Sequence, residues 1–158
     1  MARRPGVSGM SAGEAWLGAA SPVFRRRLTV EWGQCDPAGI VFHPRYFEFF
    51  DWNCVLLLEA ALGLRERAWR AELGYGGIPV VDLSSRFTAQ VRYGDEVEIA
   101  SGVTRLGRSS LEIRHELRAP AGLAVQAAQT RVWCAWDANG RLVSAPIPER
   151  LREALTHG

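Results

Sequence analysis

Lysine is absent from this chain of 158 residues, so all 19 residues in the Lys and Arg total are arginine. Any phosphate group that the protein binds must therefore be held by Arg, by hydroxyl side chains, by backbone N–H groups or by helix ends. The net charge is only +2, which is too small to argue for nucleic acid or membrane binding. We therefore expect no nucleic acid partner.

Cysteine is also scarce. The three cysteines, Cys35, Cys54 and Cys134, form an odd set without a C-x-x-C pair, so neither a disulfide framework nor a zinc site is expected. The histidines lie far apart and the acids are not clustered, which argues against any metal. Reduced thiols fit the cytoplasm, where we predict that the protein is located.

Long apolar runs are missing as well. No stretch approaches the roughly 20 apolar residues that span a bilayer, so we expect no membrane span. The N-terminus lacks the unbroken apolar region of a secretory signal, because small residues and Glu14 follow Arg3 and Arg4. Hydrophobic residues make up 47% and charged residues 23%, as in ordinary globular proteins. We predict a flexible N-terminal extension over residues 1–22 and a single domain over residues 23–158.

Hydrophobic periodicity predicts one long helix and several strands. Pro44 suits the first position of the helix and Gly63 its end. After Pro79 the apolar residues recur with a period of two. The expected strands cover residues 28–32, 81–91, 97–103, 111–117 and 123–136, with short helices at 64–73 and 148–156 and a turn at Asn139-Gly140. This order predicts an α+β fold with one helix against one curved antiparallel sheet. The uncovered part of such a sheet predicts dimerisation.

The segment from Cys35 to Asp51, CDPAGIVFHPRYFEFFD, carries the strongest indication of chemistry. It places Asp36 in a Gly/Pro loop between a strand and a buried helix. Backbone N–H groups at a helix start lack intrahelical partners, which leaves the His43 N–H as a donor for a developing oxyanion. A carboxylate beside an oxyanion site is a minimal acyl-transfer apparatus. The alternative is that Asp36 only braces the turn.

The stretch from Glu31 to Asp51 closely resembles the active-site segment of 4-hydroxybenzoyl-CoA thioesterases of the hot-dog superfamily. It also resembles the acyl-CoA thioesterases encoded with the Tol-Pal system. The shared pattern is D-x-x-G-[IV]-V-[FWY]-[YH]-x-x-[YF], and a weaker similarity covers roughly residues 24–140. The resemblance implies the hot-dog fold, in which a five-stranded antiparallel sheet wraps a long central helix.

The resemblance also implies roles for individual residues. Asp36 matches the catalytic acid, and His43 matches the residue whose backbone N–H polarises the thioester carbonyl. A role for the His43 imidazole as acid or base is the less favoured alternative. Asp51 matches an acid that contacts the aryl hydroxyl, with a solvated helix acid as the alternative. Gly39 of the motif and Tyr46 of the helix are expected to contact the substrate.

A second segment is expected to bind the nucleotide part of coenzyme A. The turn from Gly107 to Ser110 aligns with a basic-plus-Ser segment of the family that contacts coenzyme A, so Arg108 and Ser110 are candidate phosphate ligands. The family has an additional Lys where this chain has Ser109. Arg141 or an arginine of a partner subunit could compensate, and a plain solvated turn is the alternative interpretation.

These observations predict hydrolysis of an acyl-CoA thioester, aryl or short-to-medium, to the free acid and coenzyme A. Asp36 would act as nucleophile or as general base, and the sequence leaves both open. No cofactor is expected, since coenzyme A is part of the substrate. The expected assembly is a homodimer or a dimer of dimers. The alternative functions are a hot-dog enoyl-CoA hydratase or dehydratase, and a non-catalytic acyl-CoA binding protein.

Overall fold

The computed structural model of the chain describes residues 16–18 and 22–156. Its strands are β1 (Val23–Thr29), β2 (Val80–Phe87), β3 (Glu96–Leu106), β4 (Ser110–Ala119), β5 (Gly122–Val132), β6 (Cys134–Trp136) and β7 (Leu142–Ser144). Its helices are the short 3-10 helix η1 (Trp32–Gln34), α2 (Pro44–Leu62), α3 (Glu66–Glu72) and α4 (Glu149–Thr156). Within these residues, no helix is both long and apolar enough to cross a bilayer.

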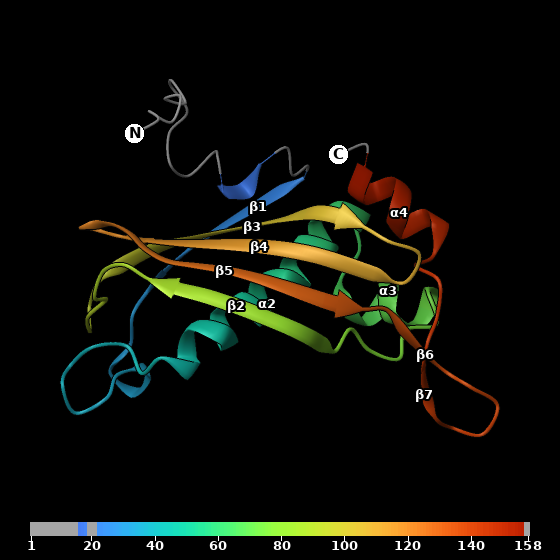
Figure 1. Ribbon diagram of the computed structural model, residues 1–158, viewed down its shortest axis with the longest axis horizontal. Coiled ribbons are helices and arrows are strands. Elements are labelled where there is room, and N and C mark those ends of the chain that lie inside the picture. The colour runs from blue at the N-terminus through green and yellow to red at the C-terminus, as the bar shows by residue number, and fades with distance from the viewer. Residues whose placement is uncertain (1–15, 19–21, 157–158) are drawn as a thin grey trace, which may run out of the picture.

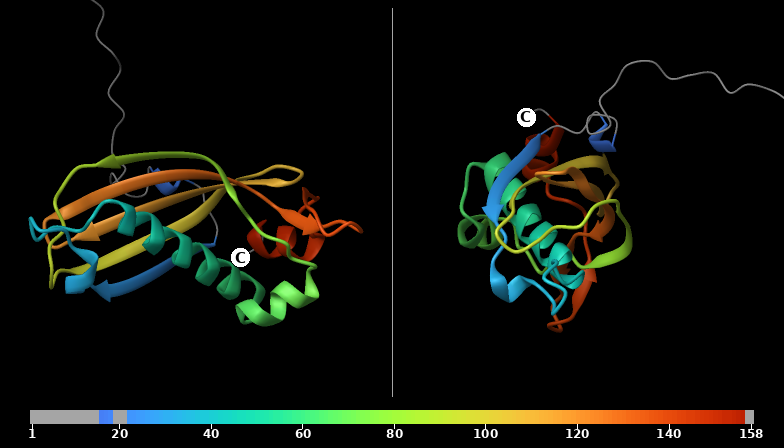
Figure 2. Two further views of the ribbon diagram at one scale, coloured as in Figure 1. Left: turned by 90° about the horizontal axis from the view of Figure 1, so that it is seen from below. Right: turned by 90° about the vertical axis from the view of Figure 1, so that its left-hand side faces the viewer.

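Five strands form one antiparallel sheet in the order β1-β3-β4-β5-β2. The sheet curves around α2, which crosses its inner face (Figures 1 and 2). Strands β6 and β7 pair separately and project from the end of the molecule that carries α3 and α4 (Figure 1). The predicted α+β architecture, with a long helix wrapped by a five-stranded sheet, is therefore confirmed.

Helix α2 forms where the sequence predicts it because both ends have suitable residues. Pro44 is its first residue, and Gly63 follows it in the left-handed conformation, with a φ of 64° that favours glycine. Its contacts with the sheet are chiefly to β1 and β3. The buried side chains are those of Tyr46, Phe49, Phe50, Asn53, Cys54, Leu57, Leu58 and Leu62. The helix thus buries one long side and leaves another exposed.

The strand expected over residues 28–32 is displaced toward the N-terminus. It ends at Thr29, and Trp32 lies in η1 with 79% of its surface exposed. The reason is a local set of hydrogen bonds: the Glu31 N–H donates to the Gln34 side chain (2.9 Å) and the Gln34 N–H donates to the Glu31 carbonyl (3.0 Å). These bonds turn the chain before Trp32 can continue the alternation.

Strand β2 differs from the other four because all eight of its residues are exposed. Leu83 and Phe87 point to the inner face of the sheet, as the alternation predicts, yet they remain 42% and 48% exposed. β2 is an edge strand that pairs only with β5. An apolar edge strand of this kind is a template for pairing with another strand.

The long strand expected over residues 123–136 is interrupted at Trp133. Its N–H donates to the Ser109 carbonyl (2.6 Å) and its side chain is buried. The chain then enters β6, which pairs with β7 across the predicted turn at Asn139-Gly140. The interruption separates β5 in the main sheet from the projecting hairpin.

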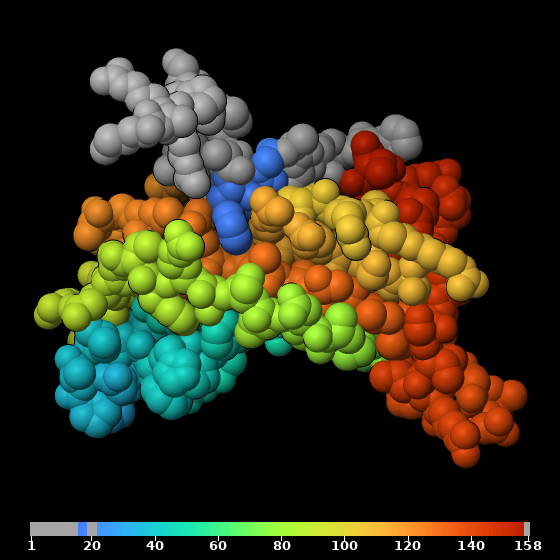
Figure 3. Space-filling view, viewed as in Figure 1, coloured from blue at the N-terminus to red at the C-terminus, as the bar shows by residue number. Residues whose placement is uncertain are grey.

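Trp16 and Leu17, which we expected to be part of a flexible extension, pack on the sheet. The Trp16 indole N–H donates to the His115 carbonyl in β4 (3.1 Å), and the Arg114 side chain donates to the Trp16 carbonyl (3.1 Å). The Arg114 guanidinium also lies 5.0 Å from the Trp16 ring centre, and Leu17 is buried. Figure 3 shows residues 16–18 lying on the strand surface. The rest of the expected extension, apart from Gly18 and Pro22, lies outside the described residues.

Candidate active site

The loop between β1 and α2 holds Asp36 in a defined orientation. The Asp36 N–H donates to the Ile40 carbonyl (2.9 Å), and the Gly39 N–H donates to the Asp36 carbonyl (2.9 Å). The carboxylate itself accepts a hydrogen bond from the Ala38 N–H through Oδ1 (2.8 Å). Gly39 has a φ of 75°, which favours glycine in this tight turn. Asp36 thus braces the turn with one oxygen, and no other hydrogen bond to its carboxylate forms among the described residues.

Asp36 faces a hollow of about 620 Å³. Gly39 lines the same hollow, together with Cys35 and two aromatic residues, Trp32 and Tyr93. Trp32 is 79% and Tyr93 62% exposed, so the hollow that Asp36 lines is also lined by two exposed aromatic residues. Sequence patterns did not indicate Trp32 or Tyr93 as site residues, because Trp32 continues the alternation of a strand and Tyr93 adjoins the turn at Gly94-Asp95.

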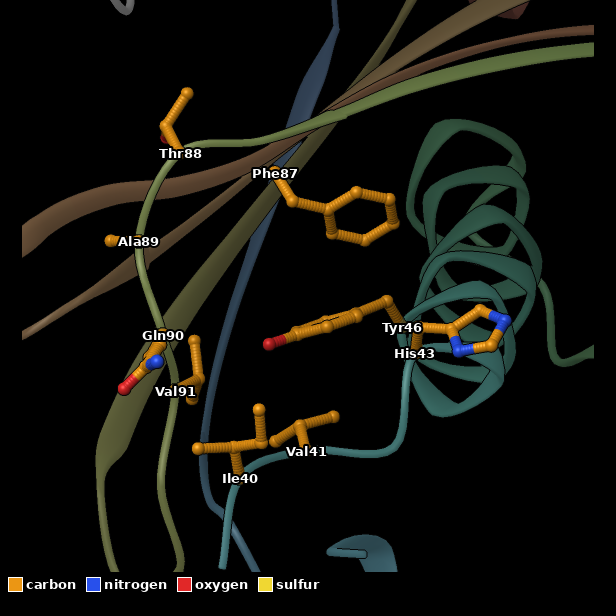
Figure 4. A pocket seen from close by; sticks show the side chains of 9 residues that line it. All are labelled: Ile40, Val41, His43, Tyr46, Phe87, Thr88, Ala89, Gln90 and Val91. Atoms are coloured by element: carbon orange, nitrogen blue, oxygen red, sulfur yellow. The ribbon is translucent and has the colours of Figure 1, made fainter. Parts of the chain in front are cut away.

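His43 precedes the first residue of α2 and lines the cavity beside the helix start. Its side chain makes no capping hydrogen bond. The His43 carbonyl accepts from the Tyr46 N–H (3.2 Å), whereas the His43 N–H has no partner in the part of the chain that the structure describes. The imidazole packs edge-on against Phe42 (5.3 Å between ring centres) and points away from the apolar side chains of the neighbouring cavity (Figure 4). The imidazole is therefore turned away from the cavity, and the backbone N–H is the unpaired polar group of His43 among the described residues.

An apolar cavity of about 380 Å³ adjoins the start of α2. Its lining residues are Ile40, Val41, His43, Tyr46, Phe87, Thr88, Ala89, Gln90 and Val91 (Figure 4). The rings of Tyr46 and Phe87 lie 5.7 Å apart. Burial raises the pKa of Tyr46 to about 12, and the nearby Cys35 and Asp95 add to the rise, so the phenol stays protonated. The cavity can take a flat, mostly apolar group.

Asp51 lies two turns further along α2 and pairs with Arg131 of β5 through Oδ1. Arg131 is buried, and its guanidinium also donates to the Gln129 side chain (2.8 and 2.9 Å) and to the Ile78 carbonyl (3.1 Å). The Asp51 side chain remains 60% exposed, so its second oxygen can still accept a hydrogen bond. We did not predict Arg131 as part of the site. The period of two in this strand could have predicted it, because Arg131 lies on the same inward face as Val125 and Ala127.

Arg108 and Ser110 lie at the other end of the sheet from Asp36. They belong to the β3–β4 turn, where the Gly107 N–H donates to the Ser110 carbonyl (2.8 Å) and the Ile147 N–H donates to the Arg108 carbonyl (2.9 Å). In Figure 1 this turn lies beside α4, whereas the loop between β1 and α2 lies at the opposite end. The structure therefore brings together Asp36, Gly39, His43 and Tyr46 at one end, and leaves Arg108 and Ser110 apart from them within one chain.

A row of buried polar side chains lies beneath α2. The Asn53 amide donates to the Ser101 hydroxyl (2.6 Å), and this hydroxyl lies 2.7 Å from Nδ1 of His115. Either group can donate this second hydrogen bond, because the hydroxyl has one proton and two acceptor lone pairs and the imidazole can carry its proton on either nitrogen. Burial lowers the pKa of His115 to about 3, with a further contribution from the Arg131 charge. His115 is thus a neutral core residue stacked on Phe50 (4.8 Å between ring centres).

Comparison with known proteins agrees with this arrangement. Residues 30–155 match the sequence profile of the thioesterase-like superfamily. The chain belongs to this superfamily. A 4-hydroxybenzoyl-CoA thioesterase from Pseudomonas sp. (strain CBS-3) is 30% identical to it over 128 residues, which cover 75% of this chain and 87% of that protein. The predicted membership of the hot-dog thioesterases is therefore confirmed.

Solved structures extend the similarity to the fold. The structure of 4-hydroxybenzoyl-CoA thioesterase from the same Pseudomonas strain superimposes with a TM-score of 0.76 at 28% identity, covering 84% of this chain and 98% of that one. A gentisyl-coenzyme A thioesterase superimposes with a TM-score of 0.68, also at 28% identity, covering 82% of this chain and 98% of the other. This thioesterase-like chain is thus an enzyme with the hot-dog fold, as predicted.

Proposed function

We propose that this enzyme hydrolyses an aryl-CoA or a short-to-medium acyl-CoA thioester to the free acid and coenzyme A. One observation carries the proposal: Asp36 and His43 lie on the same short segment before α2. The Asp36 carboxylate faces a hollow, and the His43 N–H at the helix start is unpaired among the described residues. The names of the similar proteins, which act on 4-hydroxybenzoyl-CoA and gentisyl-coenzyme A, support an aryl substrate.

The proposed chemistry uses only the side chains of the enzyme and water, without a cofactor. The His43 N–H and the positive end of α2 bind the thioester oxygen and stabilise the oxyanion that forms on attack. In one route, the Asp36 carboxylate attacks the carbonyl carbon, the C–S bond breaks, the coenzyme A thiolate leaves, and water hydrolyses the mixed anhydride. In the other route, Asp36 removes a proton from the attacking water.

The acyl group is proposed to occupy the apolar cavity at the start of α2. Tyr46 and Phe87 provide flat apolar surfaces there, and the protonated Tyr46 phenol adds no charge. The Asp51 carboxylate, held by Arg131, is proposed to accept a hydrogen bond from a polar substituent of the acyl group. A cavity of about 380 Å³ is within the usual range for small ligands, roughly 300–1,000 Å³.

We infer that the active unit is a dimer formed through β2. When two β2 strands pair antiparallel about a two-fold axis, the sheets of the two subunits run in opposite directions. The β3–β4 turn of one subunit then lies at the same end as the Asp36 loop of the other and approaches it. Arg108 of the partner subunit would then reach the coenzyme A phosphates, with Ser110 beside it. The separation of Arg108 from Asp36 within one chain supports this interpretation.

Thiol release from a panel of aryl, short, medium and long acyl-CoAs tests the proposal. The Asp36→Asn variant should fold normally and lose about 100-fold or more in kcat, the scale of a removed acid–base or nucleophilic group. The matched control is Glu48→Gln, which removes an exposed acid of α2 that pairs with Arg45. Near-normal turnover by Asp36→Asn would overturn the central role of this carboxylate.

The two alternative functions give different results in the same experiments. A hydratase would convert an enoyl-CoA to a hydroxyacyl-CoA without releasing thiol. A non-catalytic binding protein would bind acyl-CoA, measured by calorimetry, and turn over none of the panel. Thiol release that depends on Asp36 is expected only from the proposed thioesterase.

A further inference from the structure

The turn between β3 and β4 is held in a fixed shape by the C-terminal part of the chain. The Ile147 N–H, just before α4, donates to the Arg108 carbonyl (2.9 Å). The Gly107 N–H closes the turn on the Ser110 carbonyl (2.8 Å), and a side chain at position 107 would collide with Ser110 Oγ. The turn therefore has little freedom to rearrange when a ligand binds.

Arg152 of α4 reaches back to the same turn, beside which α4 lies in Figure 1. Its Nη2 donates to the Gly107 carbonyl (2.7 Å) and to the Arg108 carbonyl (3.4 Å). Both bonds use one nitrogen of the guanidinium, so Nε and Nη1 have no hydrogen-bond partner among the described residues. The Arg152 side chain is half-buried, and its charge is held against the turn with donors to spare.

No carboxylate neutralises the two arginines at this turn. In the part of the chain that the structure describes, neither Arg108 nor Arg152 forms an ion pair. Arg150, two residues earlier on α4, differs in this respect, because it pairs with Glu72 of α3. Two cations on one rigid turn repel each other, and a bound anion would remove that repulsion.

We propose that Arg152 is a second cation for the phosphates of coenzyme A and acts together with Arg108. This inference rests on the proposed function and names a further residue of the same site. The nucleotide part of coenzyme A carries a diphosphate and a phosphate on the ribose, which is more negative charge than one arginine neutralises. Ser109 brings no charge to the turn, whereas the planar guanidinium of Arg152 can donate two parallel hydrogen bonds to a phosphate.

Arg141, the other arginine that the sequence suggested for this role, lies in the projecting β6–β7 hairpin. Its N–H donates to the Asp137 side chain (2.9 Å), and its carbonyl accepts from the Asp137 N–H (2.9 Å). No hydrogen bond joins Arg141 to residues 107–110 within the described ranges. Arg152, which touches the turn directly, is therefore the better placed of the two.

Calorimetry with free coenzyme A, together with thiol release by the full chain, tests this inference. Arg152→Gln should weaken coenzyme A binding and raise the KM of the coenzyme A thioester by roughly 5- to 30-fold, with little change in kcat. A pantetheine thioester, which has no phosphate, should be turned over as by the wild type, which also shows that the variant is folded. Arg152→Lys should bind more tightly than Arg152→Gln, because lysine keeps the charge but not the planar fork. The matched control is Arg150→Gln on the same helix, which should bind coenzyme A like the wild type.

High salt separates a phosphate contact from a mere brace of the turn. At about 1 M salt, where the screening length is roughly 3 Å, Arg152→Gln and the wild type should differ less than about two-fold. A difference that persists there would mean that Arg152 only holds the turn, and would overturn the proposal. An equal loss with the pantetheine thioester, or coenzyme A binding by Arg152→Gln as tight as that of the wild type, would also overturn it.

These outcomes are distinct from a failure of the proposed function. A wild-type chain that neither binds coenzyme A nor releases thiol would remove the function and the role of Arg152 together. A wild-type chain that does both, beside an Arg152→Gln variant that is unchanged, would remove only the role of Arg152.

Discussion

Asp51 and Arg131 form an ion pair across the interface between α2 and β5 in which the two partners differ sharply in exposure. The Arg131 side chain is 8% exposed and the Asp51 side chain 60%. The desolvation penalty of the pair therefore comes almost entirely from the guanidinium. Its interactions with Asp51, the Gln129 side chain and the Ile78 carbonyl offset this penalty. The pair fixes α2 to the sheet close to the β2 edge.

We expect Asp51→Asn to lower the free energy of unfolding by about 1–3 kcal/mol, because it leaves the buried Arg131 charge without its counterion. The double variant Arg131→Met/Gln129→Leu should lie within about 1 kcal/mol of the wild type, since it replaces the buried polar groups with apolar groups of similar size. Urea unfolding measures both values. A double variant less stable than Asp51→Asn would contradict the assigned cause.

His115 should make the protein less stable in mild acid. Its pKa is lowered from 6.5 to about 3 in the folded state, so between these two values the unfolded chain binds a proton that the folded chain does not. Stability then falls as the pH falls, by about 2 kcal/mol between about pH 7 and pH 5. Urea midpoints over this interval measure the slope. The variant His115→Gln, which cannot titrate, should show a much flatter dependence, and an equal slope in both proteins would refute the assignment.

An inward-pointing charge on β2 should separate the subunits. Leu83 faces the inner side of the sheet and is 42% exposed, so Leu83→Lys places a charge where the paired strand is expected. We expect the β2-paired dimer to be lost in light scattering and the KM for thiol release to rise, because Arg108 of the partner subunit no longer reaches the substrate. Ala138→Lys, in the exposed turn between β6 and β7, is the control and should change neither.

Arg108→Ala should raise KM by roughly 5- to 30-fold with little change in kcat, since an exposed Arg–phosphate contact far from the thioester binds ground state and transition state about equally. The effect should shrink at high salt and vanish for a pantetheine thioester, which lacks the nucleotide. Arg67→Ala, an exposed arginine of α3, is the control. Equal damage to both substrates would place the coenzyme A site elsewhere.

Local sequence patterns predicted much of this molecule. The ends of α2 follow from Pro44 and Gly63, and the loop that presents Asp36 and His43 is specified by residues within ten positions of one another. The prediction of a strand through Trp32 is wrong, because the hydrogen bonds between Glu31 and Gln34 that end the alternation depend on turn geometry rather than on hydrophobicity.

Other features depend on residues far apart in the sequence. Asp51 and Arg131 are separated by 80 positions, so their pairing exists only once the sheet has formed around α2. The alternation in β2 correctly orients Leu83 and Phe87, but it gives no information about what covers them. The distance between Arg108 and Asp36 likewise follows from strand direction, which a motif comparison along the chain does not include.

The hydrogen bond from Asn53 to Ser101 fixes the axial registration of α2 on the sheet. A helix that is held only by aliphatic side chains can slide a fraction of a turn at small cost, whereas this directional bond has one correct position. The His43 N–H lies about ten residues, or roughly 15 Å, upstream on the same rigid rod. A substitution of Asn53 that lets α2 slide would therefore displace the proposed oxyanion donor at His43. Natural selection for turnover would then act on Asn53, although this residue is buried well away from the reacting atoms.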